Sequence, residues 1–444
     1  MDQPITFKRI NALAIPAIFS GISESIITLT DIAIVGNIKE NSVEALGAVG
    51  LVGSFLSAII WVVAQTKTSL SATVSQHYGS KRLLVIKTLI PQAILFNFLL
   101  SLFLFLVTTF FVHEIFTAYN AEGLLLTYAK EYYVIRAWGF PLTLITFALY
   151  GVFRGLQNTI WAMKCSLTGA ALNVILTYIL VYGIEGLIPA YHIKGAAYAS
   201  VVAQSVMLIM AFYYFFKYTP FTMRLSKRLN PSLKPFIVMS FNFIIRTATL
   251  NVAIYLANAY ATGYGKSFIA AQSILMNIWL FFSFFIDGYA TAGNALSGKL
   301  LGEKNYPALW QMSKAISKYA ILISIILIAI CFAFYEQIGL LFNQDPEVIR
   351  VFTSVFWIIL LVQPINSLAY IYDGIFKGMG DAKFLRNNLI FATFCGFLPT
   401  LLLFDYLDFQ LYSVWIAFAV WMCCRSFPLM YIFKKNYLRV NHEP

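Results

Sequence analysis

Charged residues are scarce in this sequence. Of its 444 residues, 11% are Asp, Glu, Lys or Arg, whereas 60% are hydrophobic and 17% are aromatic. A typical soluble domain carries about 25% charged residues, so this chain has too few to give a water-soluble fold a polar surface. The composition therefore predicts a protein that crosses a membrane several times.

Cysteine and histidine are also rare, and their positions indicate neither a metal site nor a catalytic centre. The five cysteines show no metal-ligand spacing and no disulfide framework, and the four histidines lie in or near predicted loops. No nucleotide-binding loop or nucleophile-base motif is present. We therefore expect no enzyme activity, no metal and no cofactor other than a coupling ion, and a channel or membrane-embedded enzyme has little support.

Long apolar segments make up most of the sequence. They are continuous and do not alternate with polar residues, which favours helices over a membrane barrel. The start MDQPITFKRIN leads into a segment long enough to span, so we interpret it as a first membrane helix and not a cleaved signal. The pattern predicts an all-α membrane protein with twelve spans. These are residues 10–35, 45–70, 88–112, 124–150, 160–183, 196–216, 235–261, 267–292, 311–335, 348–371, 384–405 and 411–433.

The net charge of +12 reflects basic residues that gather in alternate loops. Residues 81–87, 154–164, 217–234, 299–318 and 377–386 hold most of them, and both ends of the chain are basic too. Basic loops stay on the cytoplasmic side, so both termini are predicted to be cytoplasmic. The charge thus indicates topology, and we expect a lipid bilayer and a small molecule as partners and no nucleic acid.

An internal repeat divides the chain into two halves. YGVFRGLQNT (150–159) resembles DGIFKGMGDA (373–382), and the separation of Gly155 from Gly378 defines a repeat offset. The same offset separates Gly79 from Gly302 and Pro141 from Pro364. We predict pseudo-symmetric six-helix lobes at 1–216 and 235–444, joined by a cytoplasmic linker at 217–234, as in transporters that alternate access. The residues expected to shape the repeated turns are Arg154, Gly155, Asp373, Lys377, Gly378 and Asp381.

Ionisable residues inside spans are few, and each costs about 2.5–3.5 kcal/mol at mid-membrane, so each needs a partner or a function. Gly21, Glu24, Thr28 and Asp31 share one face of the first helix, which makes Asp31 and Glu24 candidates for cation coupling. Alternatively, Asp31 caps or snorkels and Glu24 pairs with an arginine. Pro16 can bend this helix during transport or impose a static kink.

Other polar residues within spans are candidates to line a cavity or to bond between helices. Asp287 either faces a cavity or pairs with a cation, and Asp373 has a nearby Lys377 as its expected partner. The remaining spanning cations are Lys67, Arg136, Arg246 and Arg425. The substrate or cavity candidates are Thr28, Asn173, Thr177, Gln204, Asn251, Gln272 and Asp287.

Six segments together resemble the multidrug and toxic compound extrusion (MATE) family, and specifically its DinF subgroup. They are ALAIPAIFSGISESIITLTDIAIVGNI, SATVSQHYGSKR, YGVFRGLQNT, IKGAAYASVVAQ, FIDGYATAGNALSGKLLGEKN and DGIFKGMGDAKFLRNN. The resemblance implies a V-shaped, monomeric antiporter of the bacterial inner membrane. Such a protein exports amphipathic, cationic compounds in exchange for H+ or Na+.

Carried over residue by residue, the resemblance makes Asp31 the coupling aspartate and Pro16 the proline that bends. Asn173 begins the family motif Asn-x-x-x-Asp, but the aspartate position is Thr177 here, and we expect Glu24 to supply the missing carboxyl. The seventh helix offers Arg246 and no acid, which favours protons over Na+. The alternative function is a flippase for lipid-linked or polyprenyl intermediates. Arg136, Arg246, Lys67 and Arg425 would support it.

Overall fold

The structure is a computed structural model that describes residues 6–38 and 41–438, apart from the side chains of Glu24, Ser25, Thr28 and Leu438. Within those residues it is helical and contains no β-strand, only one isolated bridge between Ile184 and Ile188, so the all-α prediction is confirmed. The elements are α1 (Phe7–Val35), α2 (Ser42–Val63), α3 (Thr66–Gly79), η1 (Leu83–Ile86), α4 (Leu89–Phe110), α5 (Val112–Ala118), α6 (Gly123–Arg136), α7 (Gly139–Gly155), α8 (Ile160–Tyr182), α9 (His192–Tyr218), α10 (Leu233–Tyr264), α11 (Lys266–Gly302), α12 (Tyr306–Ala333), α13 (Tyr335–Phe342), α14 (Pro346–Met379), α15 (Ala382–Phe391), the π-helix η2 (Ala392–Phe397), α16 (Leu398–Tyr406) and α17 (Leu411–Leu438).

Every predicted span has a helical counterpart. Among the described residues, ten helical segments are long and apolar enough to cross a membrane, and the pair α6 and α7 makes an eleventh. α1, with 29 residues, covers the first predicted span. The segment predicted as one span at 124–150 differs, because α6 and α7 meet at a bend of 44°. Pro141 has no N–H to donate to the Ala137 carbonyl, so the helical bonding cannot run unbroken through this point.

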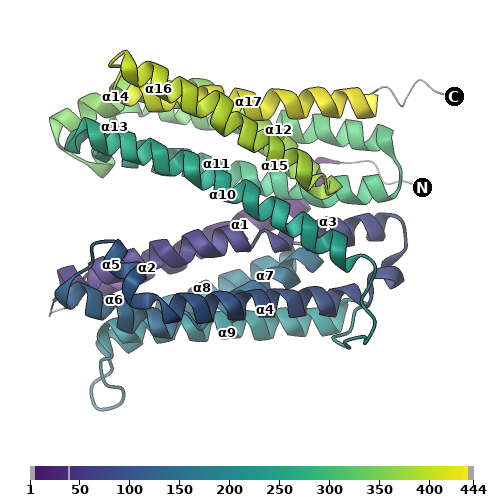
Figure 1. Cartoon of the computed structure of the whole chain (residues 1–444), viewed down its shortest axis with the longest axis horizontal. Helices are drawn as coiled ribbons and strands as arrows, with labels where there is room; N and C mark the ends of the chain where they lie inside the picture. The colour runs from purple at the N-terminus through teal and green to yellow at the C-terminus, as the bar shows by residue number, and fades with distance from the viewer. Residues whose placement is uncertain (1–5, 39–40, 439–444) are drawn as a thin grey trace. The chain divides into compact units, whose positions relative to one another are not determined.

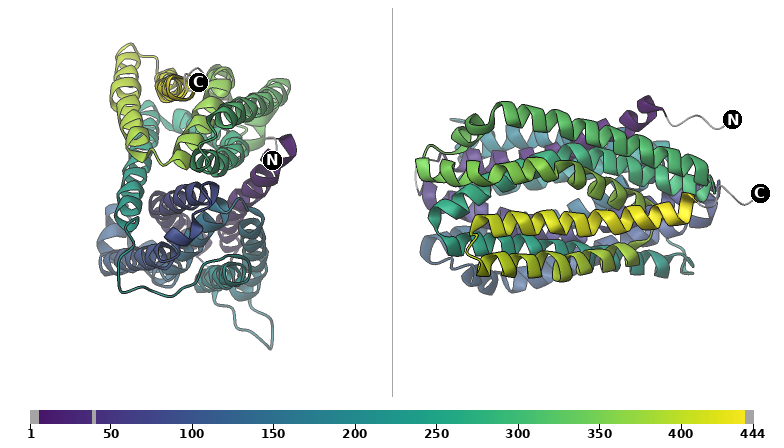
Figure 2. Two further views of the ribbon diagram at one scale, coloured as in Figure 1. Left: turned by 90° about the vertical axis from the view of Figure 1, so that its right-hand side faces the viewer. Right: turned by 90° about the horizontal axis from the view of Figure 1, so that it is seen from above.

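The helices form two compact units. The N-unit consists of Phe19–Val74 and Arg82–Ile237, and the C-unit consists of Ser75–Lys81 with the chain up to Ile18 and from Val238 onward. In the N-unit, α8 packs on α9 and α4 on α7. In the C-unit, α14 packs on α11 and α17, and α16 lies beside α17 (Figure 1, Figure 2). The lobe boundaries drawn from the sequence stay a prediction.

Glycines at equivalent positions hold equivalent helix pairs together in the two units. A Cβ on Gly151 of α7 would lie 2.4 Å from the Lys67 carbonyl oxygen, and a Cβ on Gly374 of α14 would lie 2.3 Å from that of Ala290. Both members of the second pair follow those of the first by the repeat offset. Gly155 approaches the carbonyl oxygen of Ser71 in the same way, and Gly378 approaches that of Asn294. These two pairs are also separated by the repeat offset. The sequence repeat is therefore a repeat of close helix packing, for which small residues are needed.

Replacing Gly374 by Ala is expected to lower the free energy of unfolding by about 1–3 kcal/mol, because the new methyl group must push α14 away from the α11 backbone. Gly50→Ala in α2 is the matched control. A Cβ there meets no atom within 4 Å, and Ala favours a helix over Gly. The midpoint of thermal unfolding of the purified protein measures both. Equal midpoints for the two variants would contradict the packing argument.

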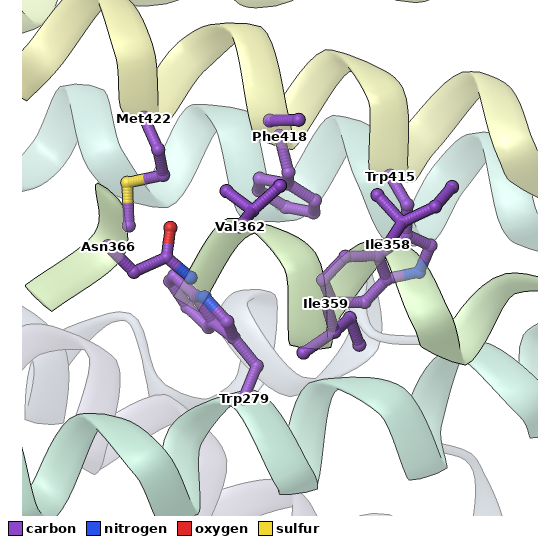
Figure 3. Close-up of a pocket in the computed structure, with 9 residues that line it drawn as sticks. Trp279, Ile358, Ile359, Val362, Asn366, Trp415, Phe418 and Met422 are labelled. Atoms are coloured by element: carbon purple, nitrogen blue, oxygen red, sulfur yellow. The ribbon is translucent and has the colours of Figure 1, made fainter. Parts of the chain in front are cut away.

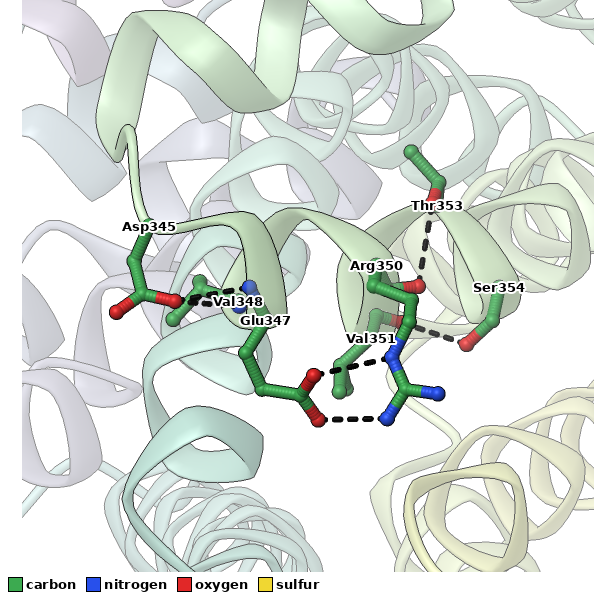
Figure 4. A network of polar contacts seen from close by, with 7 residues as sticks. All are labelled: Asp345, Glu347, Val348, Arg350, Val351, Thr353 and Ser354. Atoms are coloured by element: carbon green, nitrogen blue, oxygen red, sulfur yellow. Dashed lines mark hydrogen bonds and ion pairs between the residues drawn. The ribbon is translucent and has the colours of Figure 1, made fainter.

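The start of α14 is secured by local contacts (Figure 4). The Asp345 carboxylate accepts hydrogen bonds from the backbone N–H groups of Glu347 at 2.8 Å and Val348 at 3.3 Å, as an N-cap does. Pro346 occupies the first turn, where its missing N–H costs nothing. Glu347 and Arg350 form an exposed ion pair at 2.7 Å. The helix that carries Asp373 thus has a well-defined beginning.

Candidate functional site

Asp31 lies inside the N-unit, surrounded by hydroxyl groups. Its side chain is 2% exposed, and its carboxylate accepts one hydrogen bond from each of three other helices. The donors are Tyr132 of α6 at 3.1 Å, Thr177 of α8 at 3.2 Å and Ser200 of α9 at 2.8 Å. The carboxylate therefore joins four helices at one point.

Asn173 reaches Asp31 through Ser200. The Asn173 amide donates to Ser200 Oγ at 3.0 Å, and that hydroxyl donates onward to Asp31. Asn173 and Thr177 lie one turn apart on α8, so both face the same pocket. The Asn173 Oδ1 atom is buried and has no hydrogen-bond partner among the described residues. The pocket thus holds one unused acceptor next to the network around Asp31.

The described cations leave Asp31 without a direct ion pair. Arg136, one turn after Tyr132 on α6, attracts the carboxylate electrostatically, but no Lys or Arg among the described residues forms a salt bridge with it. Burial disfavours the ionised carboxylate, whereas three hydroxyl donors favour it. A group of this kind can take up and release a proton.

The first helix carries three other predicted residues, namely Pro16, Glu24 and Thr28. The side chains of Glu24 and Thr28 lie outside the described residues, so the idea that Glu24 supplies a second carboxyl stays a prediction. Pro16 is buried within α1, which continues through it. The division between the two units falls just after Ile18, so α1 contributes to both.

Three of the cavity candidates are not bonded to Asp31. Gln204 lies one turn after Ser200, but its Oε1 faces Gly139 at the bend between α6 and α7. That atom has no hydrogen-bond partner in the described ranges 6–38 and 41–438. Asn251 and Gln272 belong to the C-unit. Asn251 donates to the carbonyl of Thr247 in its own helix, and Gln272 accepts from the indole of Trp415.

Two members of the Asp31 network, Tyr132 and Ser200, were not predicted from the sequence. Ser200 stands in the small-residue segment IKGAAYASVVAQ, where a hydroxyl at membrane depth has few partners other than another helix. That signal could have identified it. Tyr132 is one of 26 tyrosines, and nothing local to it indicates that its hydroxyl points to α1.

The C-unit contains a separate cluster of buried charges. Arg246 of α10 forms an ion pair with Asp373 Oδ1, and Lys377 Nζ lies 2.8 Å from Asp373 Oδ2. The sequence indicated the Lys377 pair but not Arg246. Asp373 was expected to open a turn, whereas it lies inside α14. The helix continues to Met379 because Gly380 supplies the left-handed end, with a φ of 78°.

The remaining predicted turn residues have local roles. Asp381 is the N-cap of α15 and accepts from the Phe384 N–H at 3.4 Å. The Arg154 carbonyl accepts from the Gln157 N–H at 2.9 Å at the end of α7. Asp287 is exposed on α11 and interacts electrostatically with Lys377. The glycines Gly155 and Gly378 make the close packing described above.

Comparison with known proteins identifies the family. The MatE family profile matches residues 16–179 and 243–407, one segment in each half of the sequence repeat. The chain belongs to the MatE family. This confirms the MATE resemblance and, with it, the fold expected for such a transporter.

Individual MATE relatives agree with this assignment. The chain is 22% identical over 435 residues to the DNA damage-inducible protein F of Escherichia coli, covering 97% of this chain and 92% of that protein. It is 26% identical over 305 residues to the Arabidopsis thaliana protein DETOXIFICATION 45, chloroplastic, and matches 67% of this chain but only about half (51%) of that relative.

Solved MATE structures share the fold. A crystal structure of MATE in the bent conformation has a TM-score of 0.90 at 20% identity, covering 98% of this chain and 96% of that one. The Vibrio cholerae MATE transporter VcmN in the bent form has a TM-score of 0.89 at 15% identity, covering 98% and 97%. Thr177 contributes a hydroxyl that donates to Asp31. Asp31 is therefore the one carboxylate among the described side chains of its network.

Proposed function

We propose that this protein is a secondary antiporter that exports amphipathic small molecules in exchange for protons, with Asp31 carrying the proton. The observation that carries the proposal is the buried Asp31 carboxylate, held by neutral hydroxyl donors from three helices. An ionisable group at membrane depth is costly, and it is kept where a pathway needs it. The same position is the coupling site that the family resemblance implies.

Protonation of Asp31 changes its contacts with the surrounding helices. The ionised carboxylate accepts from Tyr132, Thr177 and Ser200, whereas a protonated carboxyl becomes a donor at one oxygen and loses an acceptor there. α1 is then held less firmly against α6, α8 and α9, and Pro16, where a backbone bond is missing, is the place at which α1 can bend. One proton crossing the membrane gains about 2.3 kcal/mol per 100 mV, which can drive a modest substrate gradient.

Two observations favour H+ over Na+. The side chains that hydrogen-bond to Asp31 among the described residues are hydroxyl donors, so Asp31 is the one carboxylate in this described network. α10 carries Arg246 and no Asp or Glu.

The alternating loop charges support both termini facing the cytoplasm, and a bacterial relative supports an inner-membrane location. We further propose that the protein works as a monomer without a cofactor.

The flippase alternative has weaker support. Lys67 lies over the Phe147 ring at 4.3 Å, Arg425 lies over the Trp421 ring at 4.6 Å and Arg246 is paired with Asp373. Three of the four cations named for it therefore have local partners.

The test is ion movement driven by substrate in proteoliposomes. Vesicles with an acid lumen and clamped potential receive phenyltrimethylammonium or benzenesulfonate outside, and a trapped dye reports lumen pH. We expect at least one of the two compounds to drive protons out, and a Na+ gradient at equal pH to drive no substrate uptake. Uptake that follows Na+ and moves no protons would contradict proton coupling.

A further inference from the structure

Three cations from three helices meet inside the C-unit. Arg246 of α10, Lys377 of α14 and Arg425 of α17 lie within electrostatic range of the Asp373 carboxylate. Arg246 and Lys377 each bind one oxygen of that carboxylate, whereas no ion pair within the described residues joins it to Arg425. Asp287 adds a second negative charge from the exposed face of α11. Three positive charges thus face two negative ones, and the described cluster has one positive charge in excess.

Arg425 bears this excess charge. Its side chain is 3% exposed and forms no ion pair within the described residues. Its guanidinium donates to the Met422 sulfur at 3.3 Å, and a thioether is a weak acceptor. The Arg425 Cζ lies 4.6 Å from the Trp421 ring centroid and 5.8 Å from that of Tyr370. The aromatic faces offset part of the charge but offer no oxygen to the five N–H donors.

Arg246 adds a second unused donor to the same cluster. Its Nε is buried and has no hydrogen-bond partner within the described part of the chain, although its Nη2 is paired with Asp373. Arg246 and Arg425 also repel each other electrostatically. A buried guanidinium without an anion is costly, and a carboxylate, sulfonate or phosphate oxygen is its usual partner. The cluster therefore has the charge and the donors to hold one oxyanion.

An aromatic pocket begins beside Arg425. Trp279, Trp415 and Phe418 line it, and it has room for about one water molecule as it stands (Figure 3). Met422, which touches the Arg425 guanidinium, lies with the Asn366 amide at one end, and Trp415 lies at the other (Figure 3). The Asn366 Oδ1 atom is buried and accepts no hydrogen bond from any residue that the structure describes.

Tyr370 joins the pocket to the cation from a second side. Its ring packs on Trp279 with centroids 6.4 Å apart and also lies beneath Arg425. A polar, positively charged end thus adjoins an apolar end of aromatic side chains. The two ends match the two parts of an amphipathic anion, and the aromatic side chains must separate to admit a ring between them.

We propose that the C-unit binds an amphipathic organic monoanion, whose oxyanion pairs with Arg425 and whose apolar part enters the pocket lined by Trp279, Trp415 and Phe418. The assignment rests on the proposed transport function, and it specifies an anionic substrate where the family resemblance implies a cationic one. Arg246 and Lys377 stay bound to Asp373. They add to the positive electrostatic potential at the site but do not contact the anion directly.

The test is calorimetric binding to the purified full-length protein in a neutral detergent, which needs no transport. Benzenesulfonate and phenyltrimethylammonium share one ring and carry permanent charges of opposite sign. We expect benzenesulfonate to bind, with an affinity that falls as salt rises, and sulfate to compete with it. Arg425→Gln should weaken binding about tenfold or more, the loss expected for a charge-assisted contact. Arg350→Gln, which alters an exposed arginine of the same unit, should leave it unchanged.

Stability separates a binding role from a structural one. Arg425→Gln breaks no ion pair and removes the excess charge, so its thermal midpoint should equal or exceed that of the wild type. Arg425→Lys keeps the charge without the planar fork and should bind with intermediate affinity, which tests the proposal even if the Gln variant does not fold. Binding of phenyltrimethylammonium in place of benzenesulfonate, or equal affinity in the wild type and both Arg425 variants, would overturn the anion site.

A lipid headgroup is the other source of an oxyanion. The wild type is therefore also measured in phosphatidylcholine nanodiscs with and without phosphatidylglycerol. If phosphatidylglycerol leaves the benzenesulfonate affinity unchanged, the site binds a soluble anion. If phosphatidylglycerol lowers that affinity tenfold, the lipid headgroup occupies the site, and the proposal of a soluble substrate is overturned. Benzenesulfonate binding without proton exchange in vesicles would refute the antiporter and leave the anion site standing. Proton exchange without that binding would refute the anion site alone.

Discussion

Asp31→Asn is expected to abolish proton-coupled export and to leave the amount of protein in the membrane unchanged. The amide has nearly the same shape as the carboxylate but cannot ionise, so it cannot carry a proton across the cycle. Its Oδ1 still accepts from a hydroxyl of the pocket, which preserves packing between α1, α6, α8 and α9. Substrate-driven lumen alkalinisation in proteoliposomes measures the effect, and the rate should fall to that of protein-free vesicles.

Ser200→Ala provides a graded control. It removes one of three donors to Asp31 and the acceptor for Asn173. A hydrogen bond to a charged group is worth about 1.5–3 kcal/mol, so coupled transport should fall by about tenfold and not to zero. If Asp31→Asn retains proton flux, Asp31 does not carry the proton. Glu24 would then be the remaining acid of that helix face, and loss of flux in Glu24→Gln would identify it.

Asp373→Ala is expected to lower the free energy of unfolding by about 3–5 kcal/mol, the usual cost of breaking a buried ion pair from one side. The change leaves Arg246, Lys377 and Arg425 inside the C-unit without the carboxylate that two of them bind. The remaining charges repel one another in a medium of low dielectric constant. Chemical unfolding of the purified protein measures the loss.

Two further variants show whether the loss comes from the unpaired cations. Glu347→Ala removes an exposed carboxylate from the same helix and should change stability little, because surface pairs contribute weakly. The triple variant Arg246→Met, Asp373→Leu and Lys377→Met removes the carboxylate together with both cations that bind it and should recover most of the lost stability. An Asp373→Ala protein as stable as the wild type would show that the ion pair does not support the fold.

Much of the fold could be predicted from the sequence. Each of the twelve spans from 10–35 to 411–433 corresponds to helical segments, because an apolar run of this length in lipid must satisfy its backbone internally. The repeat offset, read from Gly155 and Gly378, reappears as equivalent helix contacts. The first residues of the short helices α5 and α13 are separated by the same offset. Neither helix was predicted, since so short a segment gives too weak a local signal.

Asp31 could be selected from the sequence because an acid in an apolar helix is costly wherever its partners lie. Its partners could not be selected in the same way. Tyr132 and Ser200 are ordinary residues of their own helices, and only the packing of α6 and α9 against α1 brings their hydroxyls to the carboxylate. The bend between α6 and α7 likewise combines a local cause, Pro141, with a packed environment that the sequence does not describe.

The sequence by itself therefore determined the helical class, the spans, the repeat and the acid around which coupling is proposed. These depend on local quantities, namely side-chain hydrophobicity, helix spacing and the cost of a charge in lipid. Only the tertiary structure decided that Arg246 pairs with Asp373. The same holds, among the described residues, for the lack of an anion partner at Arg425 and for the three hydroxyls that donate to Asp31. The reason is physical, since each of these facts depends on which faces of distant helices meet, and the contacts join residues more than 100 positions apart.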